Sequence, residues 1–200
     1  MSRAWLADER AAAAADHILD AAGRCFAAHG VRRTSIADIA RAAGCSRPTI
    51  YRYFDDREAL LTAFVHRAAR TLAAEALVAA GSIEDPGERL VTAVLAVVDG
   101  VRADPTLAVW FGEGEAGGAG GAASSLVIES LATAFLGDPD DDDVRMRARW
   151  LVRVALSLMA VPGSDAADER RQLERFVVPV VLPSTSQPAA SRPSGRSRQR

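Results

Sequence analysis

The sequence predicts an all-α protein, and three observations support this fold class. Apolar residues recur at the spacing of an amphipathic helix along almost the whole chain of 200 residues. Alanine, which has the highest helix propensity of all residues, is unusually frequent. The alternating apolar and polar runs that are typical of β-strands are nearly absent. With a hydrophobic fraction of 49%, the chain can also bury a core of its own.

The N-terminal part of the chain is predicted to form three helices. They are expected over residues 8–28 and 35–42 and from residue 47 onward. The first ends where Gly30 can take the left-handed conformation that terminates a helix. Thr34 or Ser35 can cap the second helix and Ser46 the third, because their hydroxyl oxygens accept hydrogen bonds from free first-turn amides. Pro48 is compatible with the first turn of the third helix, where an amide hydrogen has no helical acceptor.

The rest of the chain is predicted to form amphipathic helices separated by breaking residues. These helices are expected over residues 57–80, 86–103, 106–111, 125–136, 138–160 and 166–182. Pro105 and Pro162 mark two of the boundaries, and the glycine-rich run 112–125 is interpreted as a loop. The acidic cluster 138–143 suits a helix start, because carboxylates oppose the partial positive charge there. The final residues, 183–200, cannot bury enough apolar surface to fold, so a disordered tail is expected.

Charge and cysteine content limit the classes of function. All 24 basic residues are arginine, and with 26 acidic residues they leave a net charge of −2, which excludes nucleic-acid binding by bulk positive charge. No apolar run is long enough to span a membrane, and the N-terminus lacks the pattern of a signal peptide. We therefore expect a cytoplasmic protein with no membrane partner. Cys25 and Cys45 are expected to be free thiols, with a redox-sensing pair as the alternative.

The sequence contains no recognisable catalytic or metal-binding pattern. His17, His29 and His66 are scattered, and no His, Cys, Asp or Glu group has the short spacing of a zinc site. The glycines at 117–121 lack the Lys-Ser/Thr ending of a phosphate-binding loop. No histidine, carboxylate and nucleophile are grouped as catalysis would require. We expect no catalytic residue, metal or cofactor, and a small helical enzyme is the alternative of a different class.

The most specific pattern lies between residues 36 and 54 and is typical of a helix-turn-helix. That motif needs a small residue on its first helix, a residue that tolerates positive φ in the turn, and a branched apolar residue on its second helix. Ala40, Gly44 and Ile50 supply these types in that order. The buried side of the motif is expected to comprise Ile39, Ala40, Gly44, Ile50 and Phe54. Taken alone, this pattern fits an ordinary helical hairpin equally well.

The outward side of the second motif helix favours a DNA-binding motif over a plain hairpin. It combines cations, hydroxyls and aromatic rings at Arg47, Thr49, Tyr51, Arg52, Tyr53 and Arg57. Arginine binds guanine or phosphate, threonine contacts the thymine methyl group, and tyrosine donates to phosphate oxygens. Residues 31–57 hold six arginines against three aspartates, a local charge of +3. Packing of either tyrosine ring against the first helix is the alternative for Tyr51 and Tyr53.

Residues 18–61 resemble the DNA-binding domain of the tetracycline-repressor (TetR/AcrR) family of bacterial transcriptional regulators. The resemblance rests on Phe26 and Gly30, Thr34-Ser35, Ile39-Ala40, and Thr49-Ile50-Tyr51-x-Tyr53-Phe54 followed by Arg57-Glu58 and Leu60. It covers about the first third of the chain. The family commonly has lysine where this chain has Arg57, and arginine preserves the positive charge. The resemblance implies a helix-turn-helix domain over residues 1–56, a helical ligand-binding and dimerisation domain over 57–182, and a tail over 183–200.

The resemblance also assigns roles to the predicted DNA-binding residues. It implies that Thr34 and Ser35 contact phosphate at the N-terminus of the second helix. The residues implied to reach base edges in the major groove are Arg47, Pro48, Thr49 and Tyr51, and those implied to hold the DNA backbone are Tyr53 and Arg57. Arg52 belongs to the same face. Because one helix-turn-helix reads only a few base pairs, a homodimer on a palindromic operator is expected.

Dimerisation and ligand binding are expected in the C-terminal helices. The resemblance implies a four-helix dimer bundle, for which the candidate residues are Trp150, Val154, Leu158, Leu173, Phe176, Val177 and Val180. The candidate pocket residues are Phe64, Leu107, Trp110, Phe111, Phe135 and Met159. Each of these side chains could instead belong to the subunit's own core. The predicted function is that of a repressor released by a small hydrophobic ligand, with an activator or a ligand-independent regulator of the same fold as alternatives.

Overall fold

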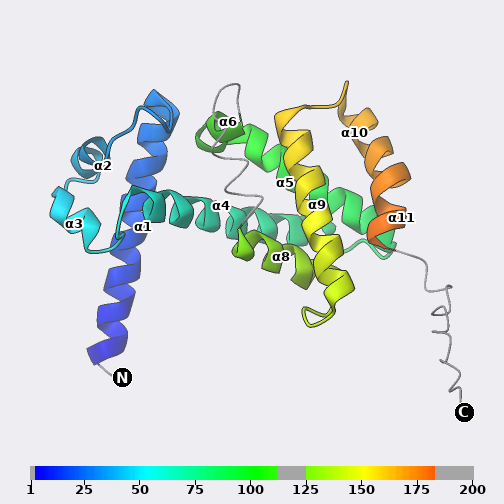
Figure 1. The fold of residues 1–200 in the computed structure, drawn as a ribbon, viewed down its shortest axis with the longest axis horizontal. Coiled ribbons are helices and arrows are strands. Elements are labelled where there is room, and N and C mark those ends of the chain that lie inside the picture. Colours follow the sequence, from blue (N-terminus) through cyan, green and yellow to red (C-terminus); the bar gives the residue numbers. More distant parts are fainter. Residues whose placement is uncertain (1–2, 112–124, 183–200) are drawn as a thin grey trace, which may run out of the picture.

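The computed structural model describes residues 3–111 and 125–182, which are helical with no strand among them (Figure 1). In chain order the elements are α1 (Arg3–His29), α2 (Ile36–Ala42), α3 (Arg47–Tyr51), α4 (Arg57–Ala80), α5 (Pro86–Ala103), α6 (Pro105–Phe111), α8 (Leu126–Leu136), α9 (Asp142–Ala160), α10 (Ala166–Gln172), the π-helical segment η1 (Leu173–Val177) and α11 (Val178–Val181). The prediction of an all-α protein is confirmed. Over the described residues, no helix combines the length and apolar character needed to cross a membrane.

The predicted boundaries of α4 and α5 are confirmed. Each helix begins directly after an aspartate that caps it. The carboxylate of Asp56 accepts a hydrogen bond from the amide of Ala59 at 2.7 Å. Asp85 caps α5 in the same way through the amide of Glu88, also at 2.7 Å. In contrast, α1 begins at Arg3 and not near residue 8. Its alanine-rich sequence lets the helix extend further toward the N-terminus than its acidic residues indicate.

The prediction of one continuous helix over residues 166–182 is wrong. The chain forms α10, the wider π-helical turn η1 and the short helix α11. The amide of Val178 donates to the carbonyl of Leu173, five residues earlier, as in a π-helix. Pro179 explains the change, because it has no amide hydrogen for the carbonyl of Arg175 and its ring would clash with that carbonyl in a regular helix.

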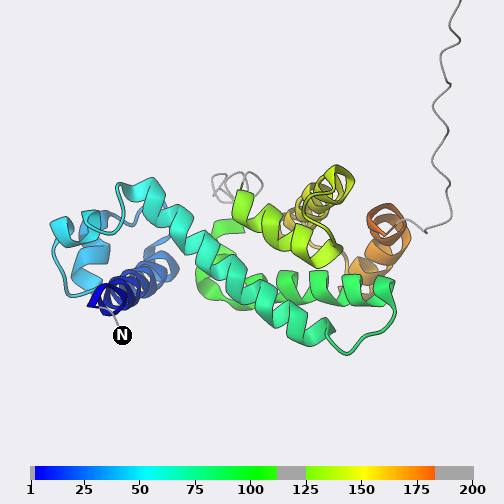
Figure 2. The same cartoon turned by 90° about the horizontal axis from the view of Figure 1, so that it is seen from below.

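The three N-terminal helices form one end of the molecule, and α4 leads from them to the other end. We call residues 3–56, with α1 to α3, the head, and the described residues from 57 to 182 the body. Figure 1 and Figure 2 show α4 running from the head into the body, where it packs along α5. The helix pair α8 and α9 covers α4 and α5, and the C-terminal helices pack on α5 and α9.

One hydrophobic core joins the head to the body. It contains Phe26 of α1 and Ile50 of α3 together with Leu60 and Phe64 of α4 and Leu107 of α6. The rings of Phe26 and Phe64 meet edge to face, with centroids 5.3 Å apart. This core therefore extends across residue 56, where the sequence places a domain boundary.

A second core holds the body together. Its buried residues come from α5, α9 and the C-terminal helices and are Leu90, Val91, Val94, Val98, Leu151, Leu158, Leu173, Val177 and Val181. A group of mostly buried polar atoms lies at its edge. Arg102 donates to both carboxylate oxygens of Glu169, at 2.7 and 2.9 Å, and to the carbonyl of Leu158 at 2.8 Å. The amide of Gly163 also donates to Glu169, at 2.8 Å. These bonds fasten α10 to α5 and α9.

Candidate functional site

The helix-turn-helix has the predicted buried side. Ile39, Ala40 and Ile50 are buried in the first core. Gly44 in the turn has φ of +65°, and a β-carbon built on it would meet no atom within 4 Å. The glycine is therefore needed for its backbone conformation and not for space. The amide of Cys45 closes the turn by donating to the carbonyl of Ala40 at 2.9 Å.

The opposite side of α3 is exposed and polar. Arg47, Pro48 and Arg52 are exposed, Tyr51 is half exposed, and Thr49 and Tyr53 are partly buried. The amide of Thr49 donates to the hydroxyl of Ser46 at 3.3 Å, so Ser46 caps α3 as predicted. This surface presents guanidinium, hydroxyl and aromatic groups together, and we call residues 46–53 the α3 face.

Two side chains of the α3 face hold each other in place. The guanidinium of Arg52 donates to the hydroxyl of Tyr53 at 3.2 Å and lies 5.1 Å from the centroid of its ring. Contact between a cation and an aromatic ring is attractive, and it reduces the freedom of both side chains. Arg52 and Tyr53 therefore present their donors as one unit.

The structure places the Thr34 side chain inside the head, and not on the surface where the phosphate contact is predicted. Its exposure is only 2%, and its hydroxyl lies within hydrogen-bond distance of the carbonyls of Gly30, at 2.8 Å, and Cys25, at 3.2 Å. Gly30 follows the last residue of α1, so its carbonyl has no helical partner, and the Thr34 hydroxyl satisfies it. The Thr34 side chain therefore stabilises the junction between α1 and α2 from inside the head.

The N-terminus of α2 is occupied by the chain's own carboxylate. Ser35 is exposed and caps α2, and both its amide and its hydroxyl donate to Asp38, at 3.1 and 2.6 Å. The amide of Asp38 donates in return to the Ser35 hydroxyl, which completes a capping box. The hydrogen bonds from Ser35 lower the pKa of Asp38 to about 2. A phosphate contact by Ser35 must therefore compete with this carboxylate.

Arg57 is engaged within the protein. One guanidinium nitrogen donates to the carbonyl of Val31 at 2.5 Å, which ties the start of α4 to the chain between α1 and α2. The side chain is partly buried. Arginine has five N–H donors, so this bond does not use up its capacity for a second partner. Arg57 thus fixes the angle at which α4 leaves the head.

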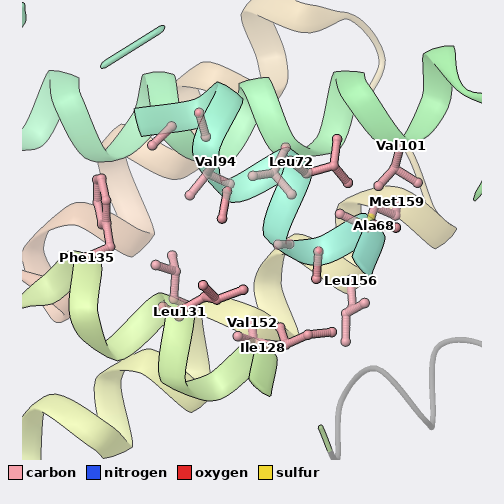
Figure 3. A pocket seen from close by; sticks show the side chains of 18 of the residues that line it. Ala68, Leu72, Val94, Val101, Ile128, Leu131, Phe135, Val152, Leu156 and Met159 are labelled. Carbon is pink, nitrogen blue, oxygen red and sulfur yellow. The ribbon is translucent and has the colours of Figure 1, made fainter. Parts of the chain in front are cut away.

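A cavity of about 290 Å³ lies in the body between α4, α5, α8 and α9 (Figure 3). The described residues that line it are Val65, Ala68, Ala69, Leu72, Ala73, Ala76, Leu77, Ala93, Val94, Val97, Val101, Leu107, Ile128, Leu131, Ala132, Ala134, Phe135, Leu151, Val152, Ala155, Leu156 and Met159. Every one of these side chains is apolar. The side chains labelled in Figure 3 come from all four helices and converge on the same space.

The predicted pocket residues divide into three groups. Leu107, Phe135 and Met159 line the cavity, as predicted. Phe64 does not, because its ring is buried against Phe26 in the first core. The side chains of Trp110 and Phe111 lie outside the described residues. The sequence prediction missed the contribution of α4, although its apolar residues at 65, 68, 69, 72, 73 and 76 follow helical spacing.

The predicted dimer residues differ in exposure, because some lie on the surface and others are buried in the subunit. Trp150, Phe176 and Val180 are exposed by 47%, 64% and 55%. The prediction is wrong for Leu158, Leu173 and Val177, which are buried in the second core of the same subunit. Val154 is partly buried against that core. On an amphipathic helix only the outward stripe is available to a partner, and here the inward stripe holds the subunit together.

Comparison with known proteins identifies the family. Residues 18–64 match the family model described as bacterial regulatory proteins, tetR family. The HTH-type transcriptional regulator Rv1255c of Mycobacterium tuberculosis is 46% identical over 200 residues, which cover 96% of this chain and 95% of that protein. The chain belongs to the tetR family. It is therefore a helix-turn-helix transcriptional regulator that binds DNA, and the family resemblance seen in the sequence is confirmed.

Solved structures of other proteins share the fold of this regulator. The structure of RolR with resorcinol has a TM-score of 0.64 and 18% identity, and the match covers 84% of this chain and 86% of that one. The structure of Thermus thermophilus FadR with lauroyl-CoA has a TM-score of 0.58 and 22% identity, with 88% and 99% covered. At such identities the likeness concerns the fold alone. The two bound ligands differ greatly in size and charge, so the shared fold leaves the ligand of this regulator open.

Proposed function

We propose that this tetR-family regulator is a homodimeric repressor that binds a palindromic operator through its α3 faces and is released by a small hydrophobic ligand. The observation that carries the proposal is the path of α4. Its first turns pack in the core of the head, and its later turns line the cavity. A single rigid helix thus touches both the DNA-reading head and the space for a ligand.

The α3 face supplies the chemistry for reading DNA. Arg47 and Arg52 are exposed cations, and Tyr51 offers a half-exposed hydroxyl between them. We expect Arg47, Pro48, Thr49 and Tyr51 to reach base edges, and Arg52, Tyr53 and Arg57 to contact the backbone. Because phosphate contacts release counterions, affinity should fall steeply as salt is raised.

The exposed aromatic and aliphatic side chains of the C-terminal helices support a homodimer. Trp150 of α9 and Phe176 of η1 are large apolar groups on the surface, with Val180 one turn beyond Phe176. Large apolar side chains exposed on the surface in this way are typical of a protein–protein interface. Pairing these surfaces in two subunits would place two α3 faces on one duplex, as a palindromic operator requires.

Side chains shared by the cavity and the first core support the release mechanism. Val101 and Leu107 line the cavity and also belong to the core that holds α1 of the head. A ligand that prefers one position of these side chains shifts the population of head orientations by its difference in affinity. The dimer would then hold its two heads at a separation that no longer fits the operator.

A footprint on the DNA that flanks the gene tests the proposal. The dimer should protect two half-sites related by two-fold symmetry, with centres about 34 Å apart or a multiple of that spacing. Arg47→Ala should change the sequence preference, whereas Arg24→Ala, on the exposed surface of α1, should leave it unchanged. Light scattering that shows a monomer at micromolar concentration would contradict the homodimer. A promoter transcription assay then distinguishes repression from activation.

A further inference from the structure

We infer that the cavity takes an uncharged aliphatic hydrocarbon chain of about a dozen carbon atoms. This inference rests on the proposed function only in treating the cavity as the ligand site. The proposed function requires a hydrophobic ligand of any kind. The structure narrows that class through four features, which are the chemistry of the lining, the state of the nearby polar groups, the size of the cavity and the charge around its mouth.

The described residues that line the cavity have no polar side chain. Among the described residues that line the cavity, the side chains are those of alanine, valine, leucine, isoleucine, one phenylalanine and one methionine. A ligand hydroxyl or carboxylate inside would lose its hydrogen bonds to water without replacement. We expect such a loss to weaken binding by about tenfold or more for each buried polar group.

The polar side chains next to the lining already have partners. At one end of the cavity, His66 of α4 and Ser125 at the start of α8 lie 2.9 Å apart, and the amide of Ile128 donates to Ser125. Burial lowers the pKa of His66, which favours its neutral form. On α8, the hydroxyl of Thr133 donates to the carbonyl of Glu129 at 2.7 Å. These groups already form hydrogen bonds within the protein, so they do not favour a ligand that carries a polar group.

The volume of the cavity indicates the size of an occupant. An apolar space of this kind costs packing contacts when empty and holds water poorly, because water needs polar partners. A cavity of about 150 Å³ with a similar lining holds one benzene molecule, which has six carbon atoms. The volume here is about 290 Å³, so it corresponds to about twelve carbon atoms.

The distribution of lining residues favours a linear chain over a compact molecule. A spherical cavity of 290 Å³ would be about 8 Å across, whereas the lining extends about 18 Å along α4 at about 1.5 Å per residue. Eight of the lining residues are alanines, whose small side chains leave room along the helices. An extended alkyl chain can follow such a path.

The mouth of the cavity disfavours anions. The lining reaches the surface at Leu77, which is 55% exposed, and at Ala134. Phe135 packs against Ala76 and Ala80, so the C-terminal ends of α4 and α8 lie together there. Residues 71–88 and 126–144 contain ten acidic residues and no arginine, lysine or histidine. Arg145 and Arg149 of α9 pair with Asp142 and Glu129, but the carboxylates outnumber these arginines. A carboxylate or phosphate group at this mouth would meet an excess of charge of its own sign.

A retention assay with n-dodecane tests the inference. The full-length regulator is equilibrated with buffer saturated with n-dodecane and gel-filtered, and the bound hydrocarbon is quantified by gas chromatography. We expect about one molecule per subunit, and less for hexane and octadecane. Excess dodecanoate, lauroyl-CoA or resorcinol should not displace it. Displacement by any of these at a concentration comparable to that of n-dodecane would overturn the inference, as would the absence of retained hydrocarbon.

Two neighbouring alanines of α4 provide a matched pair of variants. Ala73 lines the cavity, whereas Ala74 is exposed. Ala73→Phe should reduce retention by about tenfold or more by filling the space, and Ala74→Phe should leave it unchanged. Val152→Phe fills the cavity from α9 and replaces the first variant if that variant does not fold. Equal retention in folded cavity-filling and control variants would place the hydrocarbon elsewhere and overturn the inference.

DNA binding separates this inference from the proposed function. If n-dodecane is not retained but the regulator still binds its operator as a dimer, the ligand class is wrong and the DNA-binding part of the proposed function stands. If n-dodecane is retained in the cavity but does not release DNA, the ligand class stands. In that case the release mechanism under the proposed function is wrong.

Discussion

The α3 face of the head and the cavity of the body differ in the chemistry that each offers to a binding partner. On α3, Arg47, Tyr51 and Arg52 present polar groups to the outside, supported by caps and turns that lie within a few residues. In the cavity, helices from distant parts of the chain converge on one space, and each described side chain that lines it is apolar. The first surface can select a partner by hydrogen bonds, and the second can select only by size, shape and absence of charge.

The head and the body meet in the first core. Leu107 lines the cavity and belongs to the core that contains Phe26 and Phe64. Protein interiors are close-packed, so a displacement on one side of such a core is transmitted to the other. The head is therefore not an independent unit attached by a linker. Substitutions in the shared core test this connection, and substitutions elsewhere test each region alone.

The largest effect is expected where the two regions share a core. Phe26→Ala removes a fully buried ring that packs against Phe64, and it should lower the free energy of unfolding by about 3–5 kcal/mol. Urea denaturation measures this loss. As a control, Tyr51→Ala on the α3 face should change stability by less than about 0.5 kcal/mol while it weakens operator binding. Unfolding of the head in Phe26→Ala with an unchanged body would show that the two regions are separable.

The second-largest loss of stability is expected from an ion pair that lies within the body. Glu169→Gln replaces a buried carboxylate that is paired with Arg102, and it should cost about 2 kcal/mol at neutral pH. Hydrogen bonds from Arg102 lower the pKa of Glu169 in the folded state. The ion pair therefore contributes above the pKa of the unfolded chain, and the contribution is lost as pH falls through the folded-state pKa. Denaturation curves should show wild type and Glu169→Gln converging at acid pH, and a constant difference would contradict this account.

A smaller effect isolates the turn of the head. Gly44→Ala places a β-carbon on a residue with φ of +65°, which should cost about 1 kcal/mol although no atom obstructs it. Gly44→Asn should cost less, because asparagine tolerates this conformation better. Thermal denaturation of both variants measures the difference. Equal stability of the two variants would mean that the backbone conformation is not the requirement.

The smallest effect concerns charge at the edge of the DNA-binding surface. Asp38→Asn removes the carboxylate at the N-terminus of α2, and it should raise operator affinity a few-fold at low salt. The gain should disappear at high salt, where charge is screened. Fluorescence anisotropy with labelled operator measures both conditions. Unchanged affinity would place the N-terminus of α2 away from the phosphate backbone.

Most helix boundaries of this regulator could be predicted because they depend on local chemistry. Asp56 and Asp85 cap the helices that follow them, and Ser35 and Ser46 cap α2 and α3 through hydroxyls three residues from the amides that they bind. The π-helical turn before Pro179 was missed. Its carbonyl clash can be inferred from sequence, but whether the chain kinks, ends or widens depends on how η1 packs in the second core.

The sequence predicts the location of a side chain poorly where the residue type occurs both on the surface and in the core. Thr34 was assigned to phosphate, but its hydroxyl satisfies the Gly30 carbonyl at the end of α1 inside the head. Leu158 and Leu173 were assigned to a dimer surface, but they face the subunit's own core. Helical spacing shows that such residues share a face with their neighbours, and it does not show which partner covers that face.

From the sequence alone came the all-α class, the helix-turn-helix with its glycine turn, and the family. Each of these depends on patterns within a few tens of residues, where backbone geometry and capping are dictated locally. Only the tertiary structure revealed the cavity, its purely apolar lining and the core that joins the head to the body. Those features arise when α4, α5, α8 and α9 come together, and the space left between them depends on the mutual packing of side chains that are up to about ninety residues apart.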